Sequence, residues 1–322
     1  MTATPVLLPS KADLKVTTRR IVDEFERQKI RYEILFAGHS LVAFWDDAGV
    51  RQLIFSTVSH RSPTVSYIIA NDKALTLNIA KSIGIPLPIT EKYTDTARAR
   101  QFMRDHKSIV VKPIDAGHGN GVTMAVTDNK MLSHAIRFAH KYANSVLLQQ
   151  QVSGKDYRLL IIDGKFVSAV ERSPAAVTGD GQQTVRQLIH SENLSNKDRG
   201  VGYSKSACRI SLEAAKIFLE DDLDSVPSEG EYVRCVGPAN ISLGGTIIEA
   251  TGVVNLAMIA SAEQITRELK MDICGVDFIF DGTNYYLLEI NDTPGIDIHD
   301  DPFWGTKSNC FERYVSLLYK SA

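Results

Sequence analysis

Residues 271–299, MDICGVDFIFDGTNYYLLEINDTPGIDIH, decide how the rest of the sequence is interpreted. β-Branched and aromatic residues fill Cys274–Phe280 and Tyr285–Asn291, and turn-forming residues fill the positions between them. This pattern predicts two antiparallel strands joined by a turn. Because both strands are almost wholly apolar, we expect both of their faces to be covered.

Three side chains with oxygen atoms interrupt this apolar pair: Asp277, Glu289 and Asn291. A charge in an apolar strand is costly unless it is paired or binds a metal. Glu289 and Asn291 lie two apart and share a face, and Asp277 joins them only if the loop has an odd length or a bulge shifts the register. We therefore expect a Mg²⁺ or Mn²⁺ site on this face. The alternative is a buried carboxylate pair that is satisfied by arginines.

The composition is that of an ordinary globular enzyme. The chain has 322 residues, of which 44% are hydrophobic and 23% are charged, and its length suggests about two domains. The net charge of −2 indicates no general attraction to nucleic acid or acidic membranes. The four cysteines form no C-x-x-C pair and favour a reducing compartment. Without a signal-peptide pattern or an apolar run of about 18 residues, we expect a cytoplasmic protein.

A glycine-rich loop separates two predicted strands, Ser108–Pro113 and Val122–Val126. It contains GHGNG at 117–121 and follows a strand that ends with Lys112. The loop lacks the G-K-[ST] of a P-loop and the helix of a dinucleotide-binding fingerprint, and no kinase motifs follow it. We expect a hairpin whose backbone N–H groups close on phosphates. A plain glycine-rich turn is the alternative.

A second lysine, Lys73, lies in the first turn of a helix predicted from Asn71 to about Ile83. The helix dipole disfavours a cation there, so the position indicates an anionic partner outside the helix. Together with Lys112, the glycine-rich loop and the three oxygen ligands, Lys73 favours a nucleotide held between two lobes. Phosphoryl transfer requires charge neutralisation of this kind.

The sequence also resembles the ATP-grasp carboxylate–amine ligases over roughly residues 65–310. Within this family it is most similar to the ATP-grasp modules of cyanophycin synthetase and of bifunctional glutathione synthetase. The likeness rests on Lys112-Pro113 with the loop GHGNGV, GKDYR at 154–158, ERSPAAV at 171–177, NISLGG at 240–245, CGVDF at 274–278 and LEIND at 288–292.

The resemblance implies an α/β (α+β) fold of the ATP-grasp type, in which two lobes clasp ATP. Outside the resemblance, a helical pattern followed by short strand-like runs predicts a small N-terminal α/β region over residues 1–70. The N-terminal lobe with the glycine-rich lid would occupy residues 71–152. The C-terminal lobe with the metal site would occupy residues 153–322.

The resemblance also implies a role for individual residues in nucleotide binding. Two lysines would contact the nucleotide, glycines and a histidine would form the phosphate lid, and a hinge would bind adenine. An aspartate would bind the ribose and a leucine would pack on the adenine. These residues are Lys73, Lys112, Gly117, His118, Gly119, Gly121, Gln149, Gln150, Val152, Asp156 and Leu288.

By the same resemblance, Mg²⁺ would be held by the three oxygen ligands named above. Arg158 and Arg172 would lie near the transferred phosphate and the acyl substrate. Asn240, Gly244 and Gly245 would line the acyl-phosphate pocket. The hinge departs from the family pattern, since Gln149-Gln150 stands where relatives often carry two acidic residues. Glutamine keeps an amide oxygen that can accept a hydrogen bond from the adenine amino group.

The function implied is an ATP-dependent ligase that joins an amino acid or short peptide to an amine through an acylphosphate, releasing ADP and phosphate. Its partners would be small-molecule substrates, with no nucleic acid and no membrane, and a homodimer would match the dimers common among the relatives. Two alternatives stay open. One is an ATP-grasp kinase that phosphorylates a small molecule, and the other is a non-catalytic nucleotide-binding partner subunit.

Overall fold

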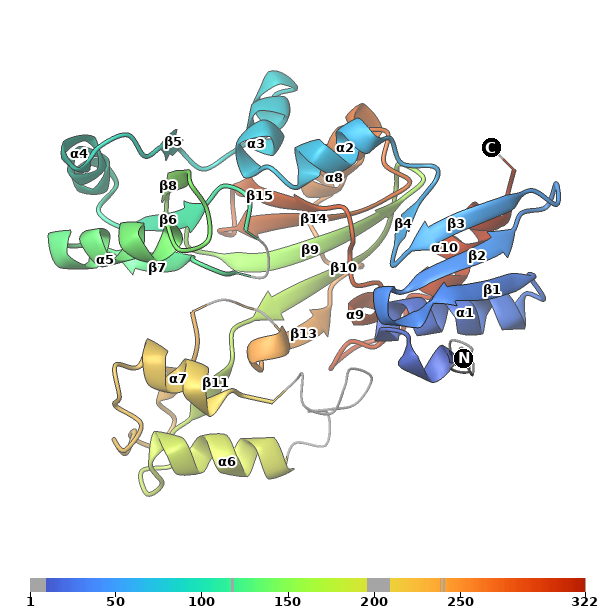
Figure 1. Cartoon of the computed structure of the whole chain (residues 1–322). Coiled ribbons are helices and arrows are strands. Elements are labelled where there is room, and N and C mark those ends of the chain that lie inside the picture. Colours follow the sequence, from blue (N-terminus) through green and yellow to red (C-terminus); the bar gives the residue numbers. More distant parts are fainter. Residues whose placement is uncertain (1–9, 117–118, 196–208, 238, 240, 322) are drawn as a thin grey trace, which may run out of the picture.

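The structure, a computed structural model, describes residues 10–116, 119–195, 209–237, 239 and 241–321. Its centre is a five-stranded antiparallel sheet in the order β13-β10-β9-β14-β15 (Figure 1). The strands are β9 (Lys155–Ile162), β10 (Lys165–Ser173), β13 (Thr246–Glu249), β14 (Ile273–Phe280) and β15 (Tyr285–Asn291).

The hairpin predicted from the sequence is confirmed. β14 and β15 pair antiparallel, with Phe280 opposite Tyr285 at the turn. The Asp281 side chain accepts hydrogen bonds from the backbone N–H groups of Thr283 at 2.8 Å and Asn284 at 2.7 Å. An aspartate that binds its own backbone in this way stabilises a tight turn.

The two faces of the central sheet are covered by different parts of the chain. Leu159 and Ile161 of β9 pack in one apolar cluster with the helix α8 (Leu256–Glu268). Leu160 and Ile162 point the other way and join the cluster that contains α1 (Val16–Arg27) and α10 (Cys310–Tyr319). This second face carries charged residues farther along β9, and the candidate site described below lies there.

The N-terminal region forms a four-stranded sheet in the order β1-β2-β3-β4, shown in blue in Figure 1. Its core-facing side chains pack against α1 and α10, so the last helix of the chain completes the core of the first region. The elements of this sheet and its loops are η1 (Lys11–Asp13), β1 (Tyr32–Phe36), η2 (Ala37–His39), β2 (Leu41–Trp45), β3 (Arg51–Phe55) and β4 (Val58–Ser59).

A second four-stranded sheet, in the order β5-β8-β6-β7, forms the lobe that carries the glycine-rich hairpin. Val111 and Leu148 lie on its buried face, which packs against two helices. Lys112 and Gln149 alternate with them and therefore lie on the opposite face. The elements are β5 (Thr90–Lys92), α4 (Thr96–His106), β6 (Ile109–Pro113), β7 (Thr123–Val126), α5 (Asn129–Ala139) and β8 (Val146–Gln150).

Two helices connect the N-terminal region to this lobe, α2 (Thr64–Ala70) and α3 (Lys73–Ser82). The Asp72 side chain caps α3 by accepting from the N–H groups of Ala74 and Leu75. Ala80 of α3 belongs to the same apolar cluster as α8, so α3 packs on the larger lobe as well.

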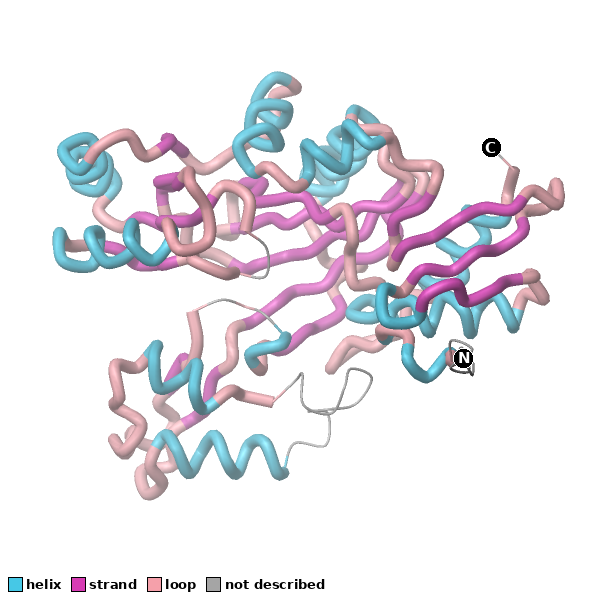
Figure 2. Tube along the Cα trace, in the orientation of Figure 1, coloured by secondary structure: helices cyan, strands magenta, loops and turns pink. Residues whose placement is uncertain are grey.

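A small helical extension follows β10 and lies below the central sheet in Figure 2. Its elements are β11 (Ala176–Thr178), α6 (Val185–Ser195), α7 (Leu212–Phe218) and β12 (Tyr232–Arg234). Two further short elements lie close to the central sheet, η3 (Ile241–Leu243) and α9 (Asp297–Asp300). No helix among the described residues is long and apolar enough to cross a bilayer.

Candidate active site

One extra residue in β15 determines which side chains share a face. The register pairs Phe278 with Leu287 but Asp277 with Glu289, so Leu288 is the bulged residue. Directly opposed residues of an antiparallel pair lie on the same face. The turn between the strands has an even number of residues, so the bulge is what brings Asp277 and Glu289 together.

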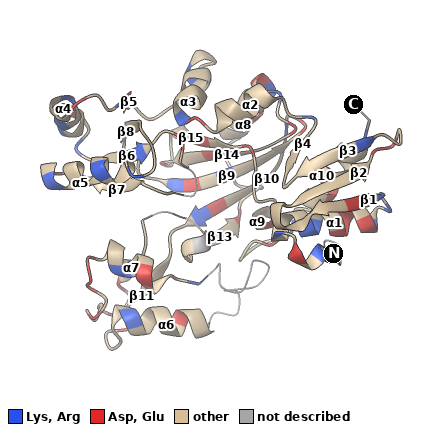
Figure 3. Ribbon diagram, viewed as in Figure 1, with Lys and Arg blue, Asp and Glu red and all other residues tan. Residues whose placement is uncertain are grey.

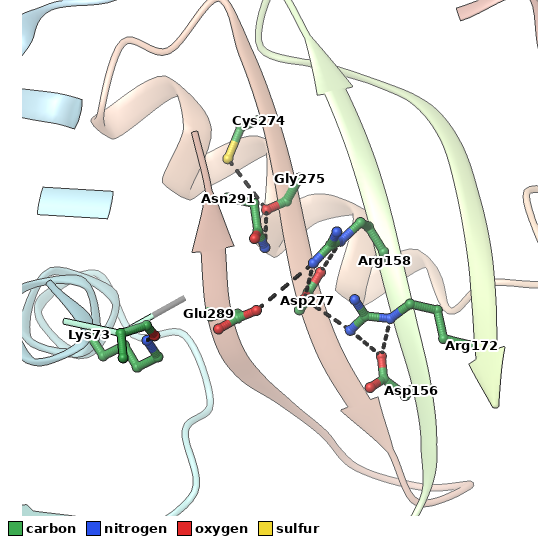
Figure 4. Close-up of polar contacts among 10 residues, drawn as sticks. Lys73, Asp156, Arg158, Arg172, Cys274, Gly275, Asp277, Glu289 and Asn291 are labelled. Carbon is green, nitrogen blue, oxygen red and sulfur yellow. Dashed lines mark hydrogen bonds and ion pairs between the residues drawn. The ribbon is translucent and has the colours of Figure 1, made fainter. Parts of the chain in front are cut away.

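Asp277 is held by two arginines. Its side chain is 1% exposed, and both carboxylate oxygens accept from Arg158, from Nε and from a terminal nitrogen, each at 2.6 Å. Arg172 donates to the same carboxylate at 2.9 Å (Figure 4). Burial raises the pKa of Asp277, but the two guanidinium groups outweigh it and hold the pKa at about 2. Pairing with arginines, the alternative to a metal site, therefore describes Asp277 in this structure.

Glu289 is bound far more loosely. Its side chain is 38% exposed, and the nearest cation is Arg158 at 3.9 Å. Asn291 lies farther along the same face, where its Nδ2 is 3.5 Å from the carbonyl oxygen of Gly275. Among the described residues, no three His, Cys, Asp or Glu side chains form a group that could hold a metal ion. The metal role of Asp277, Glu289 and Asn291 stays a prediction.

The register of the central sheet explains why the charges meet. Arg158 of β9 pairs with Asp277 of β14, and Arg172 of β10 pairs with Asp156 of β9. Arg172 donates to Asp156 Oδ1 at 2.9 Å and 2.6 Å. Charges of both signs therefore lie side by side in the middle of the sheet (Figure 3). The ribose role of Asp156 stays a prediction, and here its carboxylate binds Arg172.

Lys112 faces this sheet from the smaller lobe. It is 7% exposed, and its Nζ donates to Gln149 Oε1 at 2.9 Å. Burial lowers the pKa of Lys112 to about 8, with Glu289 opposing the shift and Lys73 adding to it. Because Glu289 belongs to the other lobe, the charges of the two lobes act on one another. Both lysines and the Glu289 carboxylate thus converge on one site.

Both ends of the Gln149 amide have a partner in this structure. Its oxygen accepts from Lys112, and its Nε2 donates to Thr90 Oγ1 at 2.8 Å. One N–H and one oxygen lone pair of the amide are left, and adenine recognition by this side chain stays a prediction. Of the other hinge residues, Gln150 and Val152 are half-buried, as is Leu288 across the site.

Lys73 connects α3 to the glycine-rich hairpin. Its Nζ donates to the carbonyl oxygen of Ala116 at 2.7 Å, and its backbone N–H donates to Ile114 at 3.2 Å. Figure 4 places Lys73 on the side of Glu289 that is away from the arginines. This position beside an anionic residue of the other lobe fits a lysine that contacts a nucleotide bound between them.

The described part of the hairpin needs glycine. Gly119 and Gly121 have φ of 76° and 73°, in the left-handed region that favours glycine. A Cβ on Gly121 would lie 2.8 Å from the Tyr142 ring. Gly117, His118 and Asn240, three other predicted site residues, lie outside the described residues.

The second predicted glycine loop lies beside the end of β10. Gly244 has φ of 94°, and a Cβ there would lie 2.5 Å from the Ile210 Cα atom. Gly245 follows it, and β13 then begins with Thr246 opposite Ser173. Ser173 is the residue after Arg172, so this loop lies at the end of the sheet where Arg172 is found. Its role in lining an acyl-phosphate pocket stays a prediction.

Two residues at the site were not expected from the sequence. Thr90 binds Gln149, and His299 is fully buried next to the arginines, with its Nδ1 3.2 Å from Ser168 Oγ. A histidine that follows Ile298 shortly after the oxygen ligands was the signal in the sequence for His299. Thr90 gave none, because a threonine in a short extended segment is common.

Comparison with known proteins agrees with this geometry. Residues 76–207 match the model of the prokaryotic glutathione synthetase ATP-grasp domain. The chain is 29% identical to cyanophycin synthetase from Synechocystis sp., over 98% of this chain and 37% of that protein. It is 26% identical to the bifunctional glutathione biosynthesis protein of Clostridium perfringens, over 95% of this chain and 41% of that one.

Among solved structures, the bifunctional glutathione synthetase from Pasteurella multocida has the same fold, with a TM-score of 0.68 and 21% identity. The match covers 96% of this chain and 44% of that chain. The chain thus spans less than half the length of each of these relatives. These matches show that the chain shares the fold of that glutathione synthetase and is similar in sequence to ATP-grasp ligases over residues 76–207.

Proposed function

We propose that the chain is an ATP-dependent carboxylate–amine ligase that forms an amide bond and releases ADP and phosphate. The observation that carries the proposal is the apposition of Asp277 and Glu289, beside two arginines, on a sheet that faces Lys112. Cations on both lobes suit a triphosphate and a second anionic substrate. We infer that the carboxylate comes from an amino acid or a short peptide, as the family suggests.

Mg²⁺ or Mn²⁺ fits the donors on this face. Asp277, Glu289 and Asn291 would hold the ion, since they supply the oxygen ligands that these hard cations prefer. Glu289 is half-exposed and its nearest cation is as far away as 3.9 Å, so its carboxylate is available. When bound, the ion would neutralise phosphate charge and orient the triphosphate.

The reaction begins when an oxygen of the substrate carboxylate attacks the γ-phosphorus of ATP. A new O–P bond forms, the bond to ADP breaks, and an acylphosphate results. Arg158 and Arg172 stabilise the transferred phosphoryl group. A neutral amine then attacks the acyl carbon, the amide bond forms, and phosphate leaves with the electrons of the acyl C–O bond and takes up the proton that the amine loses. The same arginines stabilise the oxyanion of this step.

The acylphosphate hydrolyses readily, so water must be kept away from it. The hairpin between β6 and β7 is positioned by Lys73, which binds its first residues. We propose that this hairpin closes over the phosphates and excludes water while the amine attacks.

Measuring ADP release with single amino acids and with pairs of amino acids or dipeptides tests the proposal. A ligase releases ADP at a high rate only when both a carboxylate and an amine are present. Release that needs one substrate, with a stable phosphorylated product, would identify a kinase instead. The variant Glu289→Ala, assayed in parallel, controls for contaminating ATPase.

A further inference from the structure

His299 has a buried polar atom without a partner. Its side chain is 0% exposed, and its Nδ1 is 3.2 Å from Ser168 Oγ. Nε2 has no hydrogen-bond partner among the described residues. A buried polar atom that is not hydrogen-bonded costs free energy, so a donor or acceptor that reaches Nε2 would recover that cost.

The packing of α9 places this imidazole beside the arginines. Ile298 and Val170 belong to one apolar cluster, and Val170 is the cross-strand partner of Arg158. Ser168 lies two residues before Val170 on β10, so both side chains lie on the face that carries Arg158. The imidazole, held by Ser168, therefore lies one step along the strands from the Arg158 guanidinium.

The imidazole is neutral at pH 7. Burial lowers the pKa of His299 to about 3, and the charges of Arg158 and Arg172 lower it against the opposing effect of Asp277. A neutral imidazole has one N–H donor and one lone pair that can accept. Which nitrogen carries the proton decides what the unpartnered Nε2 can do.

The hydroxyl groups around Ser168 can be assigned a consistent direction. Thr251 accepts from the N–H of Ala169 at 3.1 Å and donates to Ser168 Oγ at 3.3 Å. Ser308 Oγ is 3.1 Å from the same oxygen. A hydroxyl donates once and accepts twice, so Ser168 is fully used if it donates to Ser308 and accepts from His299 Nδ1–H. Nε2 then carries the lone pair, which is favourable beside two cations.

One terminal nitrogen of Arg158 is available as a hydrogen-bond donor. Its Nε and one terminal nitrogen bind Asp277, and its other terminal nitrogen has no hydrogen bond to the described residues. We propose that His299 is a positioning residue for Arg158, whose guanidinium donates to Nε2 and is thereby held against the transferred phosphate when the substrates bind. This inference rests on the ligase function proposed above.

The tautomer can be measured without turnover. Long-range ¹H–¹⁵N correlation spectra of the histidine rings distinguish a protonated from an unprotonated nitrogen, and His299→Asn assigns the signals. Between pH 6 and 8 we expect a neutral His299 with the proton on Nδ1. The Nε2 signal should shift when a non-hydrolysable ATP analogue and Mg²⁺ are added. A proton on Nε2, or an Nε2 signal unchanged by the analogue, would overturn the proposal.

Two amide variants separate the ring nitrogens in activity assays. Asparagine at position 299 places its amide near Nδ1 alone, whereas glutamine reaches toward Nε2. For His299→Asn we expect kcat to fall by about 10- to 100-fold with KM for ATP little changed, and for His299→Gln a smaller fall. Equal losses in the two variants, or a loss seen mainly in KM, would contradict a positioning role.

A buried polar control is available on the opposite face of the sheet. Thr266→Val removes a buried hydroxyl of α8 whose bond is to the Ala262 carbonyl of its own helix. It should leave kcat near that of the unmodified chain. If no substrate pair gives turnover even in the unmodified chain, the ligase proposal fails, while the spectra still decide the state of His299.

Discussion

Asp277 and Glu289 face each other across β14 and β15 because Leu288 is inserted as a bulge, and the two carboxylates are nevertheless held very differently. Asp277 is buried and bound by two arginines, whereas Glu289 is 38% exposed with a cation no nearer than 3.9 Å. Removal of the Asp277 carboxylate would therefore leave two largely buried guanidinium groups without this partner. Glu289 is the carboxylate with oxygens available to a ligand.

Glu289→Ala should separate activity from stability. Loss of a metal ligand removes several kcal/mol of transition-state stabilisation, so we expect kcat to fall by about 100-fold or more. The free energy of unfolding should change by less than about 1 kcal/mol, because the side chain is half-exposed and weakly paired. Steady-state kinetics and urea unfolding measure the two effects. Near-normal turnover at saturating Mg²⁺ would count against the metal assignment.

Asp277→Asn should reduce stability far more. It leaves two buried guanidinium groups without their carboxylate, and breaking a buried pair in this way costs about 3–5 kcal/mol. Asp156→Asn is the matched variant, because Arg172 then keeps Asp277 as a partner. We expect a smaller loss in that variant. Equal losses of unfolding free energy in the two variants would show that the arginines depend on Asp277 no more than on Asp156.

The stability of the unmodified chain should also report the low pKa of Asp277. The carboxyl titrates near pH 2 when folded and near 3.8 when unfolded, so the unfolded state binds more protons between these values. The contribution of Asp277 is present above pH 3.8 and is lost as the pH falls toward 2. As the pH falls from 3.8 toward 2, the free energy of unfolding should decrease less steeply in Asp277→Asn than in the unmodified chain. The same pH dependence in both proteins would contradict the assigned pKa.

ATP binding should depend on the charge of Lys112. The pKa of this lysine is about 8 in the free protein, and a bound triphosphate favours its charged form. We expect affinity to weaken as pH rises through 8, with proton uptake on binding near that pH. Calorimetry in buffers of different ionisation enthalpy measures the uptake. Binding that is independent of pH from 7 to 9.5 would exclude Lys112 from the phosphate site.

Gln149→Glu should move this pH dependence. Gln149 Oε1 accepts from Lys112 at 2.9 Å, so a carboxylate at the same place would stabilise the ammonium and raise the pKa of Lys112. The fall in ATP affinity should then begin at higher pH. Thr90→Val is the control, because it removes the other partner of Gln149 without adding a charge. A shift of the same size in both variants would refute this explanation.

The sequence was enough to predict the hairpin, its turn and the condition under which its oxygen ligands meet. The sequence alone could not show whether Asp277 lies on the same face as Glu289, because the bulge at Leu288 depends on how β15 pairs with β14. The ion pair between Arg158 and Asp277 could not be predicted either, since the two positions are 119 residues apart in the sequence and meet only through the register of the sheet. Helix α4 was not predicted, although Ala99, Phe102 and Met103, which are buried in the structure, have the i, i+3, i+4 spacing of a helix.

The origin of the oxygen in the released phosphate tests the ligase mechanism most directly. Once a productive pair of substrates is found, the carboxylate substrate is labelled with ¹⁸O and the phosphate is analysed by ³¹P NMR. An acylphosphate pathway transfers one carboxylate oxygen to phosphate in each turnover, so we predict that each phosphate carries one ¹⁸O atom. Phosphate without the label, formed while the amide accumulates, would contradict the mechanism.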